Sequence, residues 1–322
     1  MVTFEDIFAA HERIGPYIHR TPVQTSKTLD NRLGAEVFVK CENFQVTGSF
    51  KYRGATNAIL QLSVEARRNG VLTFSSGNHA QALARAGQVH NVKVTVIMPE
   101  NAPAIKKAAT EGYGAEVILY KPDETSREAL GREISESRGL TLVPPYDHPH
   151  VVAGQGTATK ELFEEIGDLD QVYVCAGGGG LLSGSAIAAN ALAPHCKVFG
   201  VEPDAGDDIC RSFRSGKLET VYNPDTIADG ARTPSASELT FGIIKERVTD
   251  MLSVPDSVLL ECMSFYAERM KMIVEPTGCL SLAGIWRNDR IIAGQRIGII
   301  VSGGNVDLRE LAGYWGSDET SC

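Results

Sequence analysis

The stretch that decides this fold is Thr47-Gly48-Ser49-Phe50-Lys51-Tyr52-Arg53-Gly54, within a sequence of 322 residues. It follows an apolar run, Ala35 to Cys41, whose β-branched residues indicate a strand, and it precedes a helical pattern. A lysine buried at the start of a helix tends to lose its proton, because burial disfavours the ammonium form and the positive end of the helix repels it. Lys51 is therefore either a nucleophile in a pocket or an ordinary solvated lysine, and this stretch alone does not choose between them.

Extended and helical segments alternate along the whole chain. The apolar segments are rich in Val and Ile and uniformly apolar, which predicts parallel sheets covered by helices on both faces and so an α/β fold. Thr3 and Asp6 predict a capping box at the start of a first helix. Strands are expected at 37–41, 71–75, 92–98, 116–120, 171–175, 197–201 and 296–301, and further helices at 49–68, 79–89, 102–112, 124–138 and 152–166.

Two turn-rich passages, 44–48 and 144–149, bracket a run of consecutive strand and helix units. We therefore predict a large domain made of residues 1–51 and 147–322. Residues 52–146 would form a small α/β domain inserted into it.

Composition excludes several classes of function. The net charge of -9 without a basic stripe argues against a nucleic-acid partner. No apolar run reaches the ~18 residues of a membrane span, and no secretion signal opens the chain. Seven cysteines form neither a CxxC pair nor a zinc pattern, so we expect reduced thiols, most of them packed in the core. A cytoplasmic protein that acts on a small molecule is expected.

A second stretch, Gly177-Gly178-Gly179-Gly180-Leu181, follows an expected strand and opens an alanine-rich helix. Bare backbone N–H groups at the positive end of a helix can hold a phosphate. The other interpretation is a tight turn that needs positive φ angles, for which one or two glycines would suffice. The stretch lacks the lysine of a nucleotide phosphate loop and the spacing of a dinucleotide site, which indicates a smaller phosphorylated cofactor.

A nucleophilic lysine and a phosphate cradle together suit pyridoxal 5'-phosphate. Four segments, Ser49 to Ala55, Ser75 to Gln81, Gly177 to Leu181 and Ser302 to Asn305, stand in the order and spacing of the fold-type II pyridoxal-phosphate enzymes. The sequence most resembles the serine/threonine dehydratase and serine racemase group, which includes threo-3-hydroxyaspartate ammonia-lyases. The resemblance covers nearly the whole chain and implies the two-domain fold of the tryptophan synthase β chain, and a homodimer.

The resemblance assigns a role to each motif. Lys51 would bind the cofactor's aldehyde and later take the Cα proton of the substrate. Phe50 would lie against the cofactor ring, Asn78 would hydrogen-bond its hydroxyl, and Ser302 would face its pyridine nitrogen. The implied cofactor-binding set is Phe50, Lys51, Asn78, Gly177, Gly178, Gly179, Gly180, Leu181, Gly230 and Ser302.

The chemistry expected from this set is dehydration. A neutral hydroxyl at Ser302 need not keep the pyridine nitrogen protonated, so prompt loss of a β-leaving group is favoured over a long-lived carbanion. Water would leave a β-hydroxy amino acid, giving a 2-oxo acid and ammonia. The alternative is racemisation, because Ser76 matches a serine that offers a proton on the face opposite the lysine in racemases of this group. Ser76 could equally only hydrogen-bond the substrate carboxylate.

Substrate recognition is expected from two places. The segment Ser75, Ser76, Gly77, Asn78 and His79 would clamp the substrate carboxylate; without the resemblance it is only a helix start with capping residues. Arg232, and more weakly Arg127, could bind a second carboxylate bidentately. Either arginine could instead be a surface ion-pair partner. The preferred substrate is therefore threo-3-hydroxyaspartate, with serine and threonine as further substrates.

The acidic turn Glu202 to Asp208 is the one candidate metal site. Its oxygen ligands suit a hard divalent cation, Mg²⁺, Mn²⁺ or Ca²⁺. The resemblance implies Glu202, the carbonyl of Gly206 and Asp208 as ligands, whereas an acidic turn by itself is usually only solvated.

Other functions are less well supported by the residues. A protein that only binds the cofactor would not need both Lys51 and Ser76. A cysteine-synthase-like β-replacement enzyme is disfavoured by the context of Lys51 and by the acidic turn. The sequence stops soon after Ser302, so we expect no regulatory domain and a role in amino acid catabolism.

Overall fold

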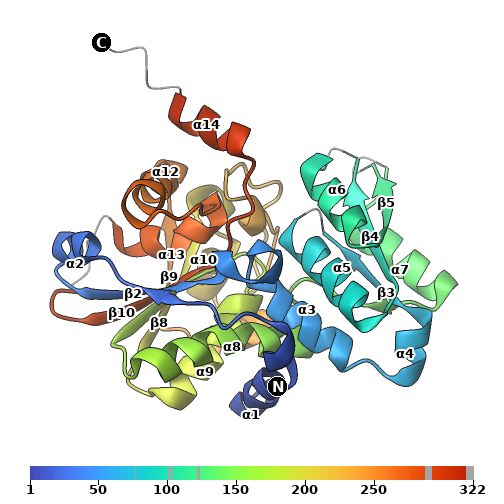
Figure 1. Ribbon diagram of the computed structural model, residues 1–322, viewed down its shortest axis with the longest axis horizontal. Helices are drawn as coiled ribbons and strands as arrows, with labels where there is room; N and C mark the ends of the chain where they lie inside the picture. The colour runs from blue at the N-terminus through green and yellow to red at the C-terminus, as the bar shows by residue number, and fades with distance from the viewer. Residues whose placement is uncertain (76, 101, 103, 122–123, 287–291, 317–322) are drawn as a thin grey trace.

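Two sheets form the frame of the molecule (Figure 1). The computed structural model describes residues 1–322 except 76, 101, 103, 122–123, 287–291 and 317–322. Strand order is β1-β2-β10-β7-β8-β9 in the larger sheet and β5-β4-β3-β6 in the smaller one. The strands are β1 Val23–Gln24, β2 Glu36–Cys41, β3 Val71–Phe74, β4 Val94–Pro99, β5 Glu116–Tyr120, β6 Thr141–Leu142, β7 Gln171–Cys175, β8 Lys197–Pro203, β9 Asp250–Val254 and β10 Arg296–Val301.

Every neighbouring pair of these strands is parallel except β1 with β2. The α/β class with parallel sheets is therefore confirmed. The helices are α1 Phe4–Ile14, α2 Lys27–Leu33, α3 Lys51–Leu60, α4 Val64–Asn69, α5 Asn78–His90, α6 Ala104–Gly112, α7 Arg127–Arg138, α8 Pro149–Ile166, α9 Gly180–Leu192, α10 Asp208–Ser215, α11 Glu238–Arg247, α12 Asp256–Phe265, α13 Pro276–Trp286 and α14 Leu308–Gly316.

Helix starts follow the capping residues. The capping box at the start of α1 is confirmed, since Thr3 N donates to Asp6 Oδ2 at 2.9 Å and the Thr3 hydroxyl accepts from Asp6 N. α7 begins at Arg127 rather than Glu124, because the Ser126 hydroxyl accepts from Ala129 N at 3.1 Å and ends the preceding turn.

The single helix expected over 49–68 is wrong. It is two helices, α3 and α4, because Ser63 caps a new helix by accepting from Ala66 N at 3.1 Å. α3 also starts later than expected, since Ser49 is extended and forms a β-bridge with Gly303. Lys51 is therefore the first residue of its helix. The short strands β1 and β6 carry too few residues for a pattern, and they were not predicted.

The smaller sheet has its own apolar core. Tyr52 and Ala55 of α3 pack there with Leu83 and Val96, whereas the larger sheet is the centre of a second core. All four strands of the smaller sheet lie between β2 and β7 in the chain. We therefore retain, as a proposal, a small domain of residues 52–146 inserted into a large one of 1–51 and 147–322.

A buried ionic cluster lies beneath α3. Arg53 donates from Nε to Glu42 Oε2 and from Nη1 to Glu161 Oε1, each at 2.7 Å, and Lys40 Nζ donates to Glu161 Oε2 at 2.7 Å. These four side chains are almost completely buried. Burial alone would raise the pKa of Glu161, but Arg53 and Lys40 lower it to about 2. The cluster joins α3, β2, α8 and the turn after β2, and it holds the helix that starts with Lys51.

Within the described ranges, none of the helices has the length and apolar composition needed to cross a bilayer.

Candidate active site

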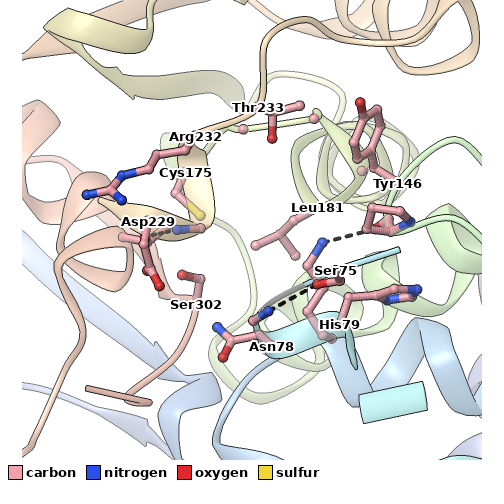
Figure 2. Close-up of a pocket in the computed structure, with 18 of the residues that line it drawn as sticks. Ser75, Asn78, His79, Tyr146, Cys175, Leu181, Asp229, Arg232, Thr233 and Ser302 are labelled. Carbon is pink, nitrogen blue, oxygen red and sulfur yellow. Dashed lines mark hydrogen bonds between the residues drawn. The ribbon is translucent and has the colours of Figure 1, made fainter. Parts of the chain in front are cut away.

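A cavity of about 260 Å³ lies where several parallel strands end (Figure 2). Ser75 follows β3, Cys175 is the last residue of β7 and Ser302 follows β10, and all three line the cavity. The carboxyl ends of parallel strands are where α/β proteins bind ligands. Sequence motifs far apart in the chain therefore meet in one place.

Lys51 lies in this cavity. Its Nζ donates to the carbonyl oxygen of Pro145 at 2.9 Å and lies 5.1 Å from the centroid of the Phe50 ring. Burial lowers the pKa of Lys51 to about 8, against small opposing effects of Cys175 and Glu275. An unusually large fraction of this amine is therefore neutral near neutral pH, as a nucleophile requires.

The glycine stretch connects β7 to α9 and lines the cavity together with Leu181. A Cβ at Gly178 would lie 2.1 Å from Cδ1 of Tyr146, and one at Gly177 would lie 2.9 Å from the carbonyl oxygen of Gly230. Gly179 has φ +81°. Packing and backbone conformation thus require all three glycines, whereas the sequence analysis allowed one or two for a tight turn. The number of glycines therefore does not by itself indicate a phosphate site. The start of α9 at the cavity remains an anion-binding feature.

The segment after β3 contributes the start of α5 to the cavity. Gly77 N donates to the Ser75 hydroxyl at 3.2 Å, and Asn78 is the first residue of the helix. Asn78 Nδ2 donates to Glu275 Oε1 at 2.7 Å. Ser76 lies outside the described residues.

His79 contributes less than the sequence suggested. Its Nε2 lies 3.1 Å from the carbonyl oxygen of Val143, and its ring points away from Leu181 in Figure 2. Burial lowers the pKa of His79 to about 3, so the ring stays neutral. Its Nε2 is therefore occupied by the Val143 carbonyl oxygen, and the ring carries no positive charge for the predicted carboxylate clamp.

Ser302 and Cys175 both line the cavity, at the ends of the neighbouring strands β10 and β7. Burial raises the pKa of the Cys175 thiol to about 11, so the thiol keeps its proton. The sequence suggested core packing for most cysteines, and each cysteine within the described residues is indeed buried and free. Cys175 also lines the cavity, and its position two residues before the glycine stretch was the available signal. Cys322 is not among the described residues.

Three charged residues of the cavity were not predicted. Lys106 of α6 forms an ion pair with Asp229, which lies in a short helical turn, Asp229–Ala231, and both residues line the cavity. Glu275 precedes α13 and is almost completely buried; burial raises its pKa to about 8. No local pattern marks these residues, because their partners are far away in the chain. Gly230, which was predicted, lines the cavity and donates its N–H to Thr277 Oγ1 at 2.9 Å.

Arg127 and Arg232 both line the cavity. Arg232 Nε donates to the carbonyl oxygen of Thr226 at 2.8 Å, and its guanidinium group points away from Leu181 in Figure 2. The Arg127 guanidinium lies 5.5 Å from the centroid of the Phe74 ring. The two arginines thus stand at the border of the cavity rather than beside Lys51.

Glu202 and Asp208 lie together at the junction of β8 and α10. Glu202 accepts hydrogen bonds from the N–H groups of Ile209 at 3.3 Å and Cys210 at 2.8 Å. Both oxygens of Asp208 are buried, and neither has a hydrogen-bond partner among the described residues. Burial raises the pKa of Asp208 to about 7, and burial together with Asp208 raises that of Glu202 well above its usual value. Neither carboxylate has an ion-pair partner in the part of the chain that the structure describes.

These features define the class of protein. Residues 14–303 match the family of pyridoxal-phosphate dependent enzymes, and the chain belongs to that family. The chain is therefore an enzyme whose cofactor is pyridoxal 5'-phosphate.

Individual relatives are similar over almost their whole length. The chain is 55% identical over 312 residues to a serine racemase of Schizosaccharomyces pombe, covering 97% of each sequence. It is 54% identical over 310 residues to an L-threo-3-hydroxyaspartate ammonia-lyase of Saccharomyces cerevisiae, covering 96% of this chain and 95% of that one. The crystal structure of a Dictyostelium discoideum serine racemase matches with a TM-score of 0.88 and 45% identity, covering 95% of this chain and 99% of that one.

Proposed function

We propose that this enzyme is an ammonia-lyase that converts threo-3-hydroxyaspartate to a 2-oxo acid and ammonia. The observation that carries the proposal is the charge of the cavity. Its described lining contains four basic side chains, Lys51, Lys106, Arg127 and Arg232, but two carboxylates, Asp229 and Glu275. An excess of positive charge suits a cofactor phosphate and a substrate with two carboxylates.

The residues present fit the cofactor and the elimination reaction. Lys51 would bind the aldehyde of the cofactor, and the start of α9 with Gly177 to Leu181 would hold its phosphate. Phe50 would cover one face of the ring, with Gly230 and Ser302 at its edges. Bound pyridoxal phosphate withdraws electrons from the substrate's Cα, which makes the Cα proton acidic.

Proton transfer is the task of this chain's own residues. Once the substrate's amino group has displaced it from the cofactor, Lys51 would take the Cα proton as a neutral amine and pass that proton to the departing β-hydroxyl, which leaves as water. The resulting enamine tautomerises and is hydrolysed to the 2-oxo acid and ammonia. The start of α5, with Ser75, Gly77 and Asn78, would hold the substrate's α-carboxylate, because N–H groups at a helix start favour an anion.

The second candidate is a racemase. One observation favours it: relatives named serine racemase are about as similar as the ammonia-lyases. The family resemblance also matches Ser76, in sequence, to the serine that offers a proton on the face opposite the lysine in racemases of this group. Racemisation would return the proton to the other face of Cα instead of expelling the hydroxyl.

A divalent cation is also part of the proposal. Glu202, Asp208 and the carbonyl of Gly206 would bind Mg²⁺, Mn²⁺ or Ca²⁺, with water completing the shell. Two buried carboxylates without a cationic partner support this, since oxygen ligands of this kind suit hard cations. From the family resemblance we also propose a homodimer, and we keep the cytoplasm as the proposed location.

The decisive experiment separates the two reactions. The cofactor-loaded enzyme is incubated with serine, threonine and each stereoisomer of 3-hydroxyaspartate, and both the 2-oxo acid and the inverted amino acid are quantified. We expect oxaloacetate from one threo isomer to form much faster than pyruvate from serine. Inverted amino acid as the main product would instead establish the racemase.

The role of Arg232 is tested by the ratio of activity on 3-hydroxyaspartate to activity on serine. We expect Arg232→Ala to lower activity on 3-hydroxyaspartate about tenfold or more relative to serine, because a bidentate ion pair to the second carboxylate is lost. Arg138→Ala, at an exposed ion pair with Glu116, is the matched control. An unchanged ratio for Arg232→Ala would remove this residue from substrate recognition, and Arg127→Ala is then the next variant.

A further inference from the structure

The side-chain amides of Asn78 and Asn305 connect three sequence motifs that are far apart in the chain. Asn305 Nδ2 donates both to the carbonyl oxygen of Thr47 at 2.7 Å and to Asn78 Oδ1 at 2.9 Å. Asn78 Nδ2 donates to Glu275 Oε1 at 2.7 Å. The backbone of Asn305 also lies close enough to Glu275 to lower its pKa, which closes the ring of neighbours.

The donor and acceptor types in this ring leave one orientation for each amide. A backbone carbonyl only accepts hydrogen bonds, so Asn305 must turn its NH₂ group toward Thr47. The second hydrogen of that NH₂ group points to Asn78, so Asn78 must turn its oxygen toward Asn305. The NH₂ group of Asn78 therefore faces Glu275 and the cavity. One of its two hydrogens is used by Glu275, and the other is available to a ligand.

The backbone around the ring makes room for it. Thr47 has φ +64°, a left-handed conformation that is unusual for a β-branched residue. A Cβ at Gly48 would lie 2.4 Å from Asn305 Oδ1, and one at Gly303 would lie 2.3 Å from Glu275 Oε1. Strain of this kind persists where surrounding contacts hold it, often beside functional sites. Here the strained backbone leaves space for the side chains of Asn78, Asn305 and Glu275.

We propose that Asn305 is a positioning residue that fixes the Asn78 amide with its NH₂ group toward the cofactor. The inference rests on the proposed cofactor role of Asn78, which would donate to the ring hydroxyl. Asn305 does not line the cavity that holds Lys51, so it acts through Asn78 rather than on the cofactor itself. With the Asn78 amide reversed, an oxygen would face the ring hydroxyl and the hydroxyl would have to donate instead of accept.

The test is Asn305→Asp, which keeps the shape of the side chain but removes both N–H donors. Asn78 must then turn its NH₂ group toward residue 305. We expect about tenfold weaker binding of pyridoxal phosphate and a changed visible absorbance spectrum of the bound cofactor, because one oriented hydrogen bond is lost. Asn43→Asp is the matched control: Asn43 Nδ2 donates to the carbonyl oxygen of Ile273 at 3.3 Å, and this variant should bind as the parent does.

A double-variant cycle separates positioning from general support of the fold. If Asn305 acts through Asn78, Asn305→Asp should change neither affinity nor spectrum further once Asn78→Ala is present. An additive effect of the two substitutions, or parental affinity and spectrum in Asn305→Asp, would overturn the inference. Should Asn305→Asp fail to fold, the same cycle is run with Asn305→Ala, which introduces no charge.

The melting temperature of the cofactor-free variants completes the test. A merely structural role would lower it for Asn305→Ala and leave the spectrum of the loaded enzyme unchanged, which also overturns the inference. The proposed function fails separately: the parent protein itself would then show no visible cofactor band and no borohydride-dependent modification of Lys51.

Discussion

The ionic cluster beneath α3 and the acidic junction of β8 with α10 bury charge in opposite ways. In the cluster, Arg53 and Lys40 give both carboxylates cationic partners at 2.7 Å. At the junction, Glu202 accepts from two backbone N–H groups, and neither oxygen of Asp208 has a hydrogen-bond partner within the described ranges. Burying an ionised carboxylate is costly unless it is paired. The cluster is therefore complete within the chain, whereas the junction needs protons or an added cation.

Lys51 stands between these two cases. It has no ion-pair partner among the residues that the structure describes, and burial lowers its pKa to about 8, so loss of the proton removes the buried charge. Burying an unpaired charge is costly, and this one rule applies to both sites. At the acidic junction it favours binding of a metal cation, and at Lys51 it favours the neutral, nucleophilic amine.

The largest effect is expected from opening the cluster. Arg53→Met leaves Glu42 buried without its cationic partner and removes one of the two cationic partners of Glu161. We expect the free energy of unfolding, measured by urea denaturation, to fall by about 3–5 kcal/mol. Arg138→Met, which removes an exposed partner of Glu116, should cost no more than about 1 kcal/mol. An equal loss of unfolding free energy in the two variants would show that the buried ion pairs of the cluster contribute no more than an exposed one.

The same comparison predicts an acid response for the cluster. The pKa of Glu161 is lowered to about 2 in the folded protein, so its ion pairs add stability above the usual carboxyl range. That contribution is lost as pH falls from about 4.5 toward 2, because the unfolded chain binds a proton first. Urea midpoints over this range should therefore fall less steeply for Glu161→Gln than for the parent.

A smaller effect is expected at the acidic junction. A divalent cation at about one hundred times its dissociation constant should stabilise the parent by about 2.7 kcal/mol, and a chelator should reverse this. Asp208→Asn should make the metal-free protein at least as stable as the parent, since it removes an unpaired buried carboxylate, and should abolish the response to metal. A persistent metal response in this variant would place the site elsewhere.

The smallest effect concerns Lys51 and is kinetic. Only the neutral amine attacks the cofactor's aldehyde, so the rate of cofactor uptake by the cofactor-free protein should rise with pH and level off above about 8. Stopped-flow absorbance measures this rate, with N-acetyl-lysine as the reference amine, which should keep rising toward about 10.4. If both rates rise up to the same pH, the pKa of Lys51 is not lowered in the folded protein.

Local patterns were sufficient for much of the fold. The strands at 116–120, 171–175 and 296–301 have the predicted bounds, because an apolar run between turn residues is a local property. The helix over 49–68 was wrong, since the capping strength of Ser63 outweighed a continuous helical pattern. Lys51, the glycine stretch and Ser302, which the sequence singled out, all line the cavity: Lys51 begins a helix, and the other two follow the ends of strands.

The amino-acid sequence by itself determined the class of fold, the segments that surround the cavity and the lysine at its centre. Only the tertiary structure decided which residues face one another there. Glu275 and Asn305 meet Asn78 across 197 and 227 residues of chain, and Arg53 meets Glu161 across 108. Such pairs leave no periodic trace, because hydrogen bonds and ion pairs between distant segments form only after the strands have set their positions. The charge environment of Lys51 is therefore a property of the folded molecule, although its place at the start of a helix was already present in the sequence.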